Sequence, residues 1–227
     1  MAGITTANES LPPAMRAARR SRLRALVLIL LLGAGAAVPL RKPLLRAAGW
    51  ALVAGDPIER ADIIVVTSDA DGAGVLEAAD LVQAGVAARV AVFADPPDSV
   101  DEEFIRRGVP YEDAGARAIR QLEALGIGAA EQIPRPVVGS DDEARILPGW
   151  CDERGFRSVV VVSMADHSRR LRRLLRRFMK GHAKACVRPA RYSPFDPDHW
   201  WETRQGTRTA LMELQKLLLD IVLHPIS

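Results

Sequence analysis

The chain has 227 residues, of which 48% are hydrophobic and 26% are charged, and its formal net charge is +3. Its length fits one N-terminal segment followed by one globular domain of about 170 residues. Two cysteines without paired spacing and four scattered histidines argue against a metal cluster. We expect Cys151 and Cys186 to be buried free thiols because both lie in predicted regular elements, and the alternative is one disulfide in an oxidising compartment.

The charges are unevenly distributed along the chain. Residues 61–155 carry 8 basic and 19 acidic groups, whereas residues 156–192 carry 11 basic groups and 1 acidic group. The basic block indicates an anionic partner. Aromatic residues do not alternate with these basic residues, which argues against nucleic acid bound by base stacking.

The N-terminal part reads as a membrane-targeting segment. We expect a disordered basic N-terminus over residues 1–22, a transmembrane anchor or signal over 23–42 and a juxtamembrane segment over 43–59, with a helix at Leu44–Gly55. The apolar run Ala25–Leu40 is shorter than the about 20 residues of a typical span, but flanking arginines can extend it. An uncleaved anchor is favoured over a cleaved signal peptide or a buried soluble helix.

The basic residues around the apolar run predict its orientation. Five arginines precede the run and three basic residues follow it. This bias keeps the N-terminus in the cytoplasm. The globular domain is therefore expected on the extracytoplasmic side of the cytoplasmic membrane.

Strand and helix patterns alternate over residues 60–227. Continuous apolar runs predict strands at Ile63–Thr67, Val90–Phe93, Ile133–Val138, Val159–Ser163 and Ala183–Arg188. Helical periodicity predicts helices at Val75–Ala84, Ala114–Leu125, Asp141–Arg154, His167–Lys180 and Gln205–Leu223. The alternation predicts an α/β three-layer sandwich with a mostly parallel sheet. Pro134 and Pro136 place the third strand near an edge.

The fourth predicted strand leads into the most informative segment. Ser163 ends the strand, and His167, Arg169 and Arg170 open the following helix. Ligands of open α/β sheets bind outside the carboxyl ends of the strands, and helix N-termini attract anions. We therefore expect His167 and Arg170 to hold an anionic group such as a phosphate. The alternative is that they cap and solvate an ordinary surface helix.

The same helix carries a high density of positive charge. Its seven basic residues are Arg169, Arg170, Arg172, Arg173, Arg176, Arg177 and Lys180. The apolar stripe that contains Leu171 and Leu174 faces the sheet. Anionic lipid or the acidic residues of 61–155 are the two expected partners of the basic faces.

Three further groups could contact a ligand. Ser68, Asp69 and Asp71 follow the first strand and could approach a ligand or hold a divalent cation, or could form an acidic surface turn. Glu143 is a candidate general base or orienting partner of His167, and its alternative role is a capping-box acid behind the predicted N-cap Ser140.

Aromatic and charged residues near the C-terminus could also contribute. Trp200 and Trp201 could form the base of a sugar-binding or lipid-binding site, or could anchor their loop at a membrane interface. Glu213 and Lys216 lie one helical turn apart and are expected to form a surface pair.

Four segments resemble the YdcF/SanA/ElyC-like family. They are Ala61–Val66, Leu76–Gly85, the turn that begins Ser140-x-x-Glu143-Ala144, and Val162-Ser163-x-x-x-His167-x-x-Arg170. The resemblance implies a Rossmann-like domain of the bacterial envelope, linked to cell-wall polysaccharide biogenesis, with Glu143, His167 and Arg170 as its site. The chain departs from the pattern at Ser68–Asp71, where glycines are usual, and at Gly74, where an arginine is usual. A further departure is Ala94-Asp95-Pro96, where the family usually has Ser-Gly-Gly.

These observations lead to three hypotheses. The first is a membrane-anchored envelope protein that binds a phosphate-bearing glycan or polyprenyl phosphate, with His167 as acid, base or phosphate ligand, Arg170 as anion clamp and Glu143 as orienting acid or base. The second is a non-catalytic scaffold that binds anionic lipid or a protein partner through the arginine-rich helix. The third is a nucleotide- or S-adenosylmethionine-binding domain. The sequence specifies no cofactor and leaves open whether the protein is an enzyme.

Overall fold

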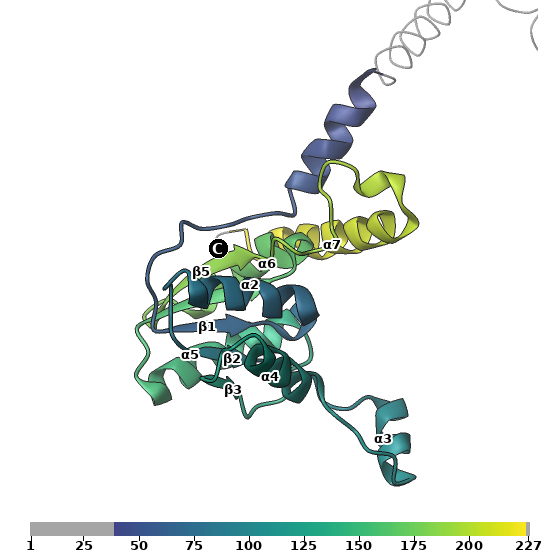
Figure 1. Ribbon diagram of the computed structural model, residues 1–227. Coiled ribbons are helices and arrows are strands. Elements are labelled where there is room, and N and C mark those ends of the chain that lie inside the picture. The colour runs from purple at the N-terminus through teal and green to yellow at the C-terminus, as the bar shows by residue number, and fades with distance from the viewer. Residues whose placement is uncertain (1–38, 226–227) are drawn as a thin grey trace, which may run out of the picture. The chain divides into compact units, whose positions relative to one another are not determined.

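The structure is a computed structural model that describes residues 39–225 (Figure 1). The chain divides into two compact units, Met1–Leu45 and Arg46–Ser227, and the second contains the α/β domain. The predictions for residues 1–22 and for nearly all of 23–42 lie outside the described residues. Among the described residues, no helix is both long enough and apolar enough to cross a membrane.

The domain is built on a five-stranded, all-parallel sheet with the order β3-β2-β1-β4-β5. The strands are β1 (Ile63–Val66), β2 (Val90–Val92), β3 (Ala130–Gln132), β4 (Ser158–Ser163) and β5 (Lys184–Pro189). Every residue of the central strand β1 is buried, as expected for a strand covered on both faces. The predicted α/β class and the parallel sheet are confirmed.

Helices cover both faces of the sheet (Figure 1). Helices α2 (Asp71–Gln83) and α4 (Ala114–Ala124) pack on one face, and α5 (Ser140–Arg154) and α6 (Ser168–Phe178) pack on the other. Short 3-10 turns η1 (Ser68–Ala70) and η2 (Ala165–His167) follow β1 and β4. The C-terminal helix α7 (Arg204–Leu223) packs against α6, η2 and the turn η3 (Trp200–Glu202).

Several local predictions were wrong. The third strand lies at Ala130–Gln132 rather than at Ile133–Val138, because Pro134 and Pro136 cannot donate ladder hydrogen bonds. Gly139, with a φ of 81°, is the N-cap of α5, so Ser140 is already helical. Helix α3 (Ser99–Arg106) was not predicted; it buries none of its residues and stands off the sheet layers in Figure 1.

The predicted juxtamembrane helix ends early. The helix stops at Trp50, and residues 53–60, here called the strap, run beside the edge strand β5. The backbone N–H of Asp56 donates to the Val187 carbonyl, and the Asp56 carboxylate accepts from the Val187 N–H. The strap thus pairs part of an edge that would otherwise be open.

The strand order creates a topological switch point. The chain moves from β1 outward to β2 and β3, and α5 then returns it to β4 on the other side of β1. The connections after β1 and β4 therefore leave toward opposite faces of the sheet. A crevice opens between the carboxyl ends of such strands, and this is where open α/β sheets bind ligands.

Candidate functional site

Seven polar residues meet at the carboxyl ends of β1 and β4. This group, here called the strand-end cluster, consists of Ser68, Asp69, Glu143, Asp166, His167, Arg170 and Glu213. They come from η1, α5, η2, α6 and α7. The structure therefore brings together the predicted residues Ser68, Asp69, Glu143, His167 and Arg170.

Glu143 joins α5 to the end of β1. Its Oε1 accepts a hydrogen bond of 2.7 Å from the Ser68 backbone N–H. The predicted capping-box role is wrong, because the N-cap Gly139 has no side chain to complete it. Helix α5 instead carries the carboxyl group to the strand ends.

The Glu143 carboxyl is buried, and only one of its two oxygens accepts a hydrogen bond from the described residues. The residue is 2% exposed, and its Oε2 has no hydrogen-bond partner among the residues that the structure describes. Burial, reinforced by the negative charge of Asp69, raises the pKa of Glu143 to about 7. This carboxyl can therefore exchange a proton near neutral pH.

His167 lies among three carboxylates. Its Nδ1 is 2.9 Å from Oε2 of Glu213, and its Nε2 is 3.2 Å from Oδ2 of Asp69 and 3.3 Å from Oδ2 of Asp166. Burial alone would lower the pKa of His167, but the three carboxylates outweigh it and the net pKa is raised. The surroundings therefore favour the imidazolium cation. Burial raises the pKa of Asp166, although the His167 charge acts in the opposite direction.

Glu213 is the centre of an ion-pair network. Its carboxylate lies 3.3 Å from Nε of Arg170 and 2.6 Å from Nζ of Lys216, in addition to the contact with His167. Burial would raise the pKa of Glu213, but these cations lower it to about 2. The predicted pair of Glu213 and Lys216 is present, but Glu213 does not lie on the surface, because it is 2% exposed and faces α6.

Arg170 is held by groups of the protein itself. Besides Glu213, its guanidinium donates to Oγ of Ser140 at 3.4 Å and lies 3.9 Å from the Asp141 carboxylate. Its side chain is 11% exposed. The residue is therefore partly neutralised before any ligand arrives, which differs from the simple anion clamp that the sequence suggested.

A cavity of about 390 Å³ adjoins the cluster. This α6–α7 cavity shares Arg170 with the cluster, and Arg177 and Lys216 also line it. Apolar side chains complete its wall; they are Leu174, Leu219 and Leu223. The cavity therefore offers cations and hydrocarbon surface side by side.

Three other predicted site residues lie outside the cluster, and two of them make contacts within the domain. Ser163 is buried and donates to the Met164 carbonyl. Arg169 donates to the carbonyls of Trp50 and Val53 and so holds the start of the strap. Asp71 is exposed, with a φ of 42°, and makes no hydrogen bond with the cluster among the described residues.

The two tryptophans stabilise the turn before α7. Trp200 is 6% exposed and meets the Trp201 ring edge to face at a centroid distance of 5.9 Å. Gly49 lies against Trp200 so closely that an added Cβ would come within 2.7 Å of its ring. Trp200 is thus a packing residue rather than the exposed floor of a sugar site.

The arginines of α6 have different partners from those expected. Arg173 and Arg177 pair with Asp220 of α7, and Arg172 pairs with Asp56 of the strap. Among these contacts the acidic region 61–155 supplies only the long Asp141 contact to Arg170. Most of the basic surface is therefore neutralised inside the domain.

The sequence analysis missed Asp166 and misjudged Glu213. A signal for Glu213 was present, because Ala210, Glu213 and Leu217 share the helical stripe that α7 buries. A single acidic residue on a buried stripe requires a cation near it, and the arginine-rich helix could have been expected to supply that cation. Asp166 gave no such signal, since it lies in a short turn.

Comparison with known proteins leaves the chain without an assigned family. No protein-family model matches it, and neither does any curated protein. Among solved structures it is similar to guanylylpyridinol- and ATP-bound HcgE from Methanothermobacter marburgensis, with 14% identity and a TM-score of 0.32 over 73% of this chain and 97% of that chain. A likeness this distant carries no argument about ligand or function.

Proposed function

We propose that the domain binds a phosphate-bearing glycan or a polyprenyl phosphate at the strand ends and exchanges a proton with it through Glu143. The observation that carries this proposal is the buried Glu143 carboxyl, with its unpartnered Oε2 and its pKa of about 7. A group with such a pKa can accept or donate a proton near neutral pH. Its place at the switch point is where a ligand is expected.

His167 has a positioning role in this proposal. Three carboxylates hold its ring as a cation, so it is a poor proton acceptor near neutral pH. The cation balances Glu213 and Asp166 and supports the end of β4. Proton exchange therefore rests on Glu143, and His167 keeps the surrounding charges in place.

The α6–α7 cavity supports an amphipathic phosphate as the ligand. Three cations line it against the carboxylates of Asp141 and Asp220, so positive charge is in slight excess. Leucines of α6 and α7 form the apolar wall, and the exposed residues Leu218 and Val222 directly precede two of these leucines on α7. A phosphate near Arg170 and Lys216 would leave its hydrocarbon tail against these leucines.

The N-terminal sequence supports a place at the membrane. The apolar run Ala25–Leu40, flanked by arginines, is the expected anchor, and its charge bias favours an extracytoplasmic domain. Together with the resemblance to the YdcF/SanA/ElyC-like family, this makes a bacterial envelope protein of polysaccharide biogenesis our proposal. The scaffold alternative has less support, because the arginines of α6 are mostly paired within the domain.

Titration calorimetry of the full-length protein with farnesyl phosphate tests this function. Titrations at pH 7 in buffers of different ionisation enthalpy count the protons exchanged on binding. We expect saturable binding with proton exchange in the native protein, and binding without proton exchange in Glu143→Gln. Lys216→Gln should weaken binding by about tenfold, the value of one charge-assisted hydrogen bond.

The matched control is Glu77→Gln, which alters a fully buried carboxylate that is paired with Arg188 and Arg191. This variant should bind and exchange protons like the native protein. The proposal is wrong if farnesyl phosphate does not bind to the folded protein. It is also wrong if Glu143→Gln exchanges as many protons as the native chain.

A further inference from the structure

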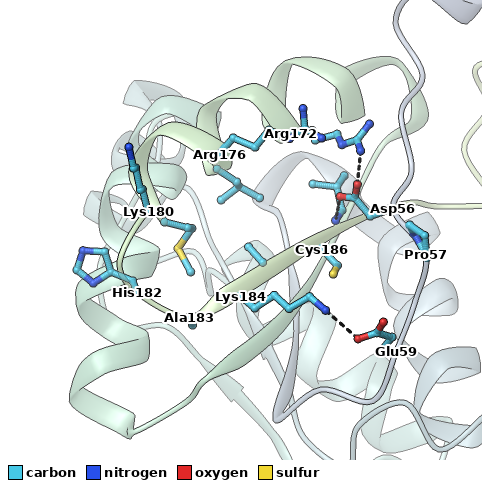
Figure 2. A pocket seen from close by; sticks show the side chains of 14 residues that line it. Asp56, Pro57, Glu59, Arg172, Arg176, Lys180, His182, Ala183, Lys184 and Cys186 are labelled. Carbon is cyan, nitrogen blue, oxygen red and sulfur yellow. Dashed lines mark hydrogen bonds and ion pairs between the residues drawn. The ribbon is translucent and has the colours of Figure 1, made fainter. Parts of the chain in front are cut away.

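A second and larger cavity lies at the outer edge of the sheet. Figure 2 shows it between α6, β5 and the strap, and its volume is about 510 Å³. It lies along the C-terminal half of α6 and the first residues of β5, whereas the strand-end cluster lies at the carboxyl ends of β1 and β4. We call it the edge cavity.

Two ion pairs hold the strap as the outer wall of the edge cavity. Arg172 of α6 lies 2.5 Å from the Asp56 carboxylate, and Lys184 of β5 lies 2.8 Å from the Glu59 carboxylate (Figure 2). Both pairs join the strap to the elements that form the other walls. The cavity therefore has a defined shape rather than being a gap beside a loose segment.

The inner surface of the edge cavity is apolar. Leu175, Met179 and Val187 are buried and belong to the core on the α6 side of the sheet. Ala183 and Ala185 also line the cavity, and their small side chains leave space where larger residues would fill it. An apolar group could bury hydrocarbon surface here.

The unpaired cations of α6 and of the turn that follows it lie at this cavity. Arg169 donates to backbone carbonyls, while Arg170, Arg172, Arg173 and Arg177 each have a carboxylate partner. Arg176 and Lys180 have no ion pair among the described residues, and both line the edge cavity. Arg176 lies in the last turn of α6 and Lys180 directly follows its C-cap Met179, so both cations stand at the same end of the cavity wall.

We propose that the edge cavity binds a phosphate monoester with an apolar substituent. The two negative charges of the phosphate match the two positive charges of Arg176 and Lys180. Neither residue forms an ion pair with another described residue. Arg176 can contact two phosphate oxygens with its planar guanidinium, and Lys180 supplies a point charge. The apolar substituent lies on Leu175, Met179 and Val187. The volume suits one small organic ligand.

Titration calorimetry of the full-length protein at low ionic strength tests this site, with phenyl phosphate as the soluble probe and vesicles containing phosphatidic acid as the lipid probe. We expect Arg176→Gln and Lys180→Gln each to weaken binding by about tenfold, for whichever of the two probes binds to the native protein. Both side chains are exposed, so the variants should fold. Arg208→Gln on the exposed surface of α7 removes the same charge and should change affinity by less than about twofold.

The two probes separate the possible sources of the phosphate. Binding of phenyl phosphate alone assigns a soluble ligand, whereas vesicle binding that Arg176→Gln removes assigns a lipid headgroup. Inorganic phosphate should bind about tenfold more weakly than phenyl phosphate, because it lacks the apolar contact. The proposal is overturned if neither probe binds, if both substitutions leave affinity unchanged, or if inorganic phosphate binds as tightly as phenyl phosphate. Farnesyl phosphate is itself such a monoester, so the variants separate the two sites. Farnesyl phosphate binding that Lys216→Gln weakens and Arg176→Gln does not belongs to the α6–α7 cavity, and the reverse pattern belongs to the edge cavity, because Lys216 lines only the former and Arg176 only the latter. The proposed function therefore fails, and this site does not, if only Arg176→Gln weakens binding.

Discussion

At the scale of single residues, Glu143 and Glu77 illustrate how surroundings decide the behaviour of a buried carboxyl. Glu143 is 2% exposed and lies near Asp69, so burial raises its pKa to about 7. Glu77 is 0% exposed, but hydrogen bonds from Arg188 and Arg191 outweigh burial and lower its pKa. Glu77 is thus a stable anion that fixes the chain after β5, whereas Glu143 remains available for proton exchange.

Glu143→Gln should stabilise the fold at high pH. Because the pKa of Glu143 is about 7 in the folded state against 4.5 ordinarily, the carboxyl ionises first in the unfolded state. Its contribution to stability is complete below pH 4.5 and falls as pH rises toward 7. The free energy of unfolding of the variant, relative to that of the native protein, should therefore increase by about 2 kcal/mol between pH 5 and pH 8. Urea unfolding at both pH values measures it.

Glu77→Gln provides the contrast for that measurement. Its pKa is lowered, so the ionised group stabilises the fold above its ordinary pKa and loses this effect as pH falls. The variant should be destabilised at pH 8 and less so under acid conditions. An equal pH response in both variants would contradict our account of Glu143.

Glu213→Gln should destabilise the cluster and lower the pKa of His167. The substitution leaves His167, Arg170 and Lys216 without their shared carboxylate, and breaking a buried ion pair costs about 3–5 kcal/mol. NMR titration of the His167 ring and urea unfolding measure the two effects. Glu202→Gln, at an exposed acid, serves as the control. An unchanged His167 pKa would show that Glu213 does not hold the ring charged.

At the scale of elements, α2 packs tightly against β1 where the two cross. Gly74 of α2 lies so near β1 that an added Cβ would be 2.7 Å from Cγ1 of Val66 and 2.5 Å from Cβ of Ala70. An arginine side chain, which the resemblance noted in the sequence led us to expect at this position, has no space here.

Gly74→Ala should destabilise the protein, and Gly72→Ala should not. The first substitution forces α2 away from β1 and should cost about 1–3 kcal/mol. At Gly72 an added Cβ meets nothing within 4 Å, so alanine should stabilise the exposed helical position by about 0.5–1 kcal/mol. Thermal unfolding of the two variants gives the comparison. Equal effects at both positions would mean that helix propensity, not packing, controls the site.

At the scale of the whole domain, the parallel sheet separates two apolar cores. Ile63, Val65 and the α5 and α6 residues form one core, and Ile64, Val66 and the α2 and α4 residues form the other. Cys151 is buried in the first core, while Cys186 packs against the second. The sheet therefore lies between the two thiols. Both cysteines are free as expected, but only Cys151 is buried, because Cys186 lies on the edge strand β5.

The cysteines should remain reduced and differ in reactivity. Denatured, unreduced protein should contain two titratable thiols per chain, and a reductant should leave the melting temperature unchanged. In the native protein Cys186 should react before Cys151, because Cys151 is fully buried and burial raises its pKa to about 12. Thiol titration with and without denaturant measures both properties. Fewer than two thiols in the denatured protein would contradict the two-core arrangement.

Local patterns in the sequence determined the elements and the fold class. Apolar runs and helical periodicity located β1, β2, β4 and β5 and the packed helices, because these signals arise from residues near one another in the chain. The strand-to-helix turns at Ser68 and His167 correctly indicated the strand ends. Helix α3 was missed although a capping box of Asp98 and Asp101 marks its start, and the prolines after β3 displaced that strand.

Only the tertiary structure decided the charges of the site. Glu213 lies 46 residues after His167 in the sequence, and only the packing of α7 on η2 and α6 brings its carboxylate to that ring. The same packing gives Arg173 and Arg177 their partner Asp220, and it leaves Arg176 and Lys180 at the edge cavity. Pairing and burial depend on distances between remote segments, and a charge pattern along the chain carries no such distances.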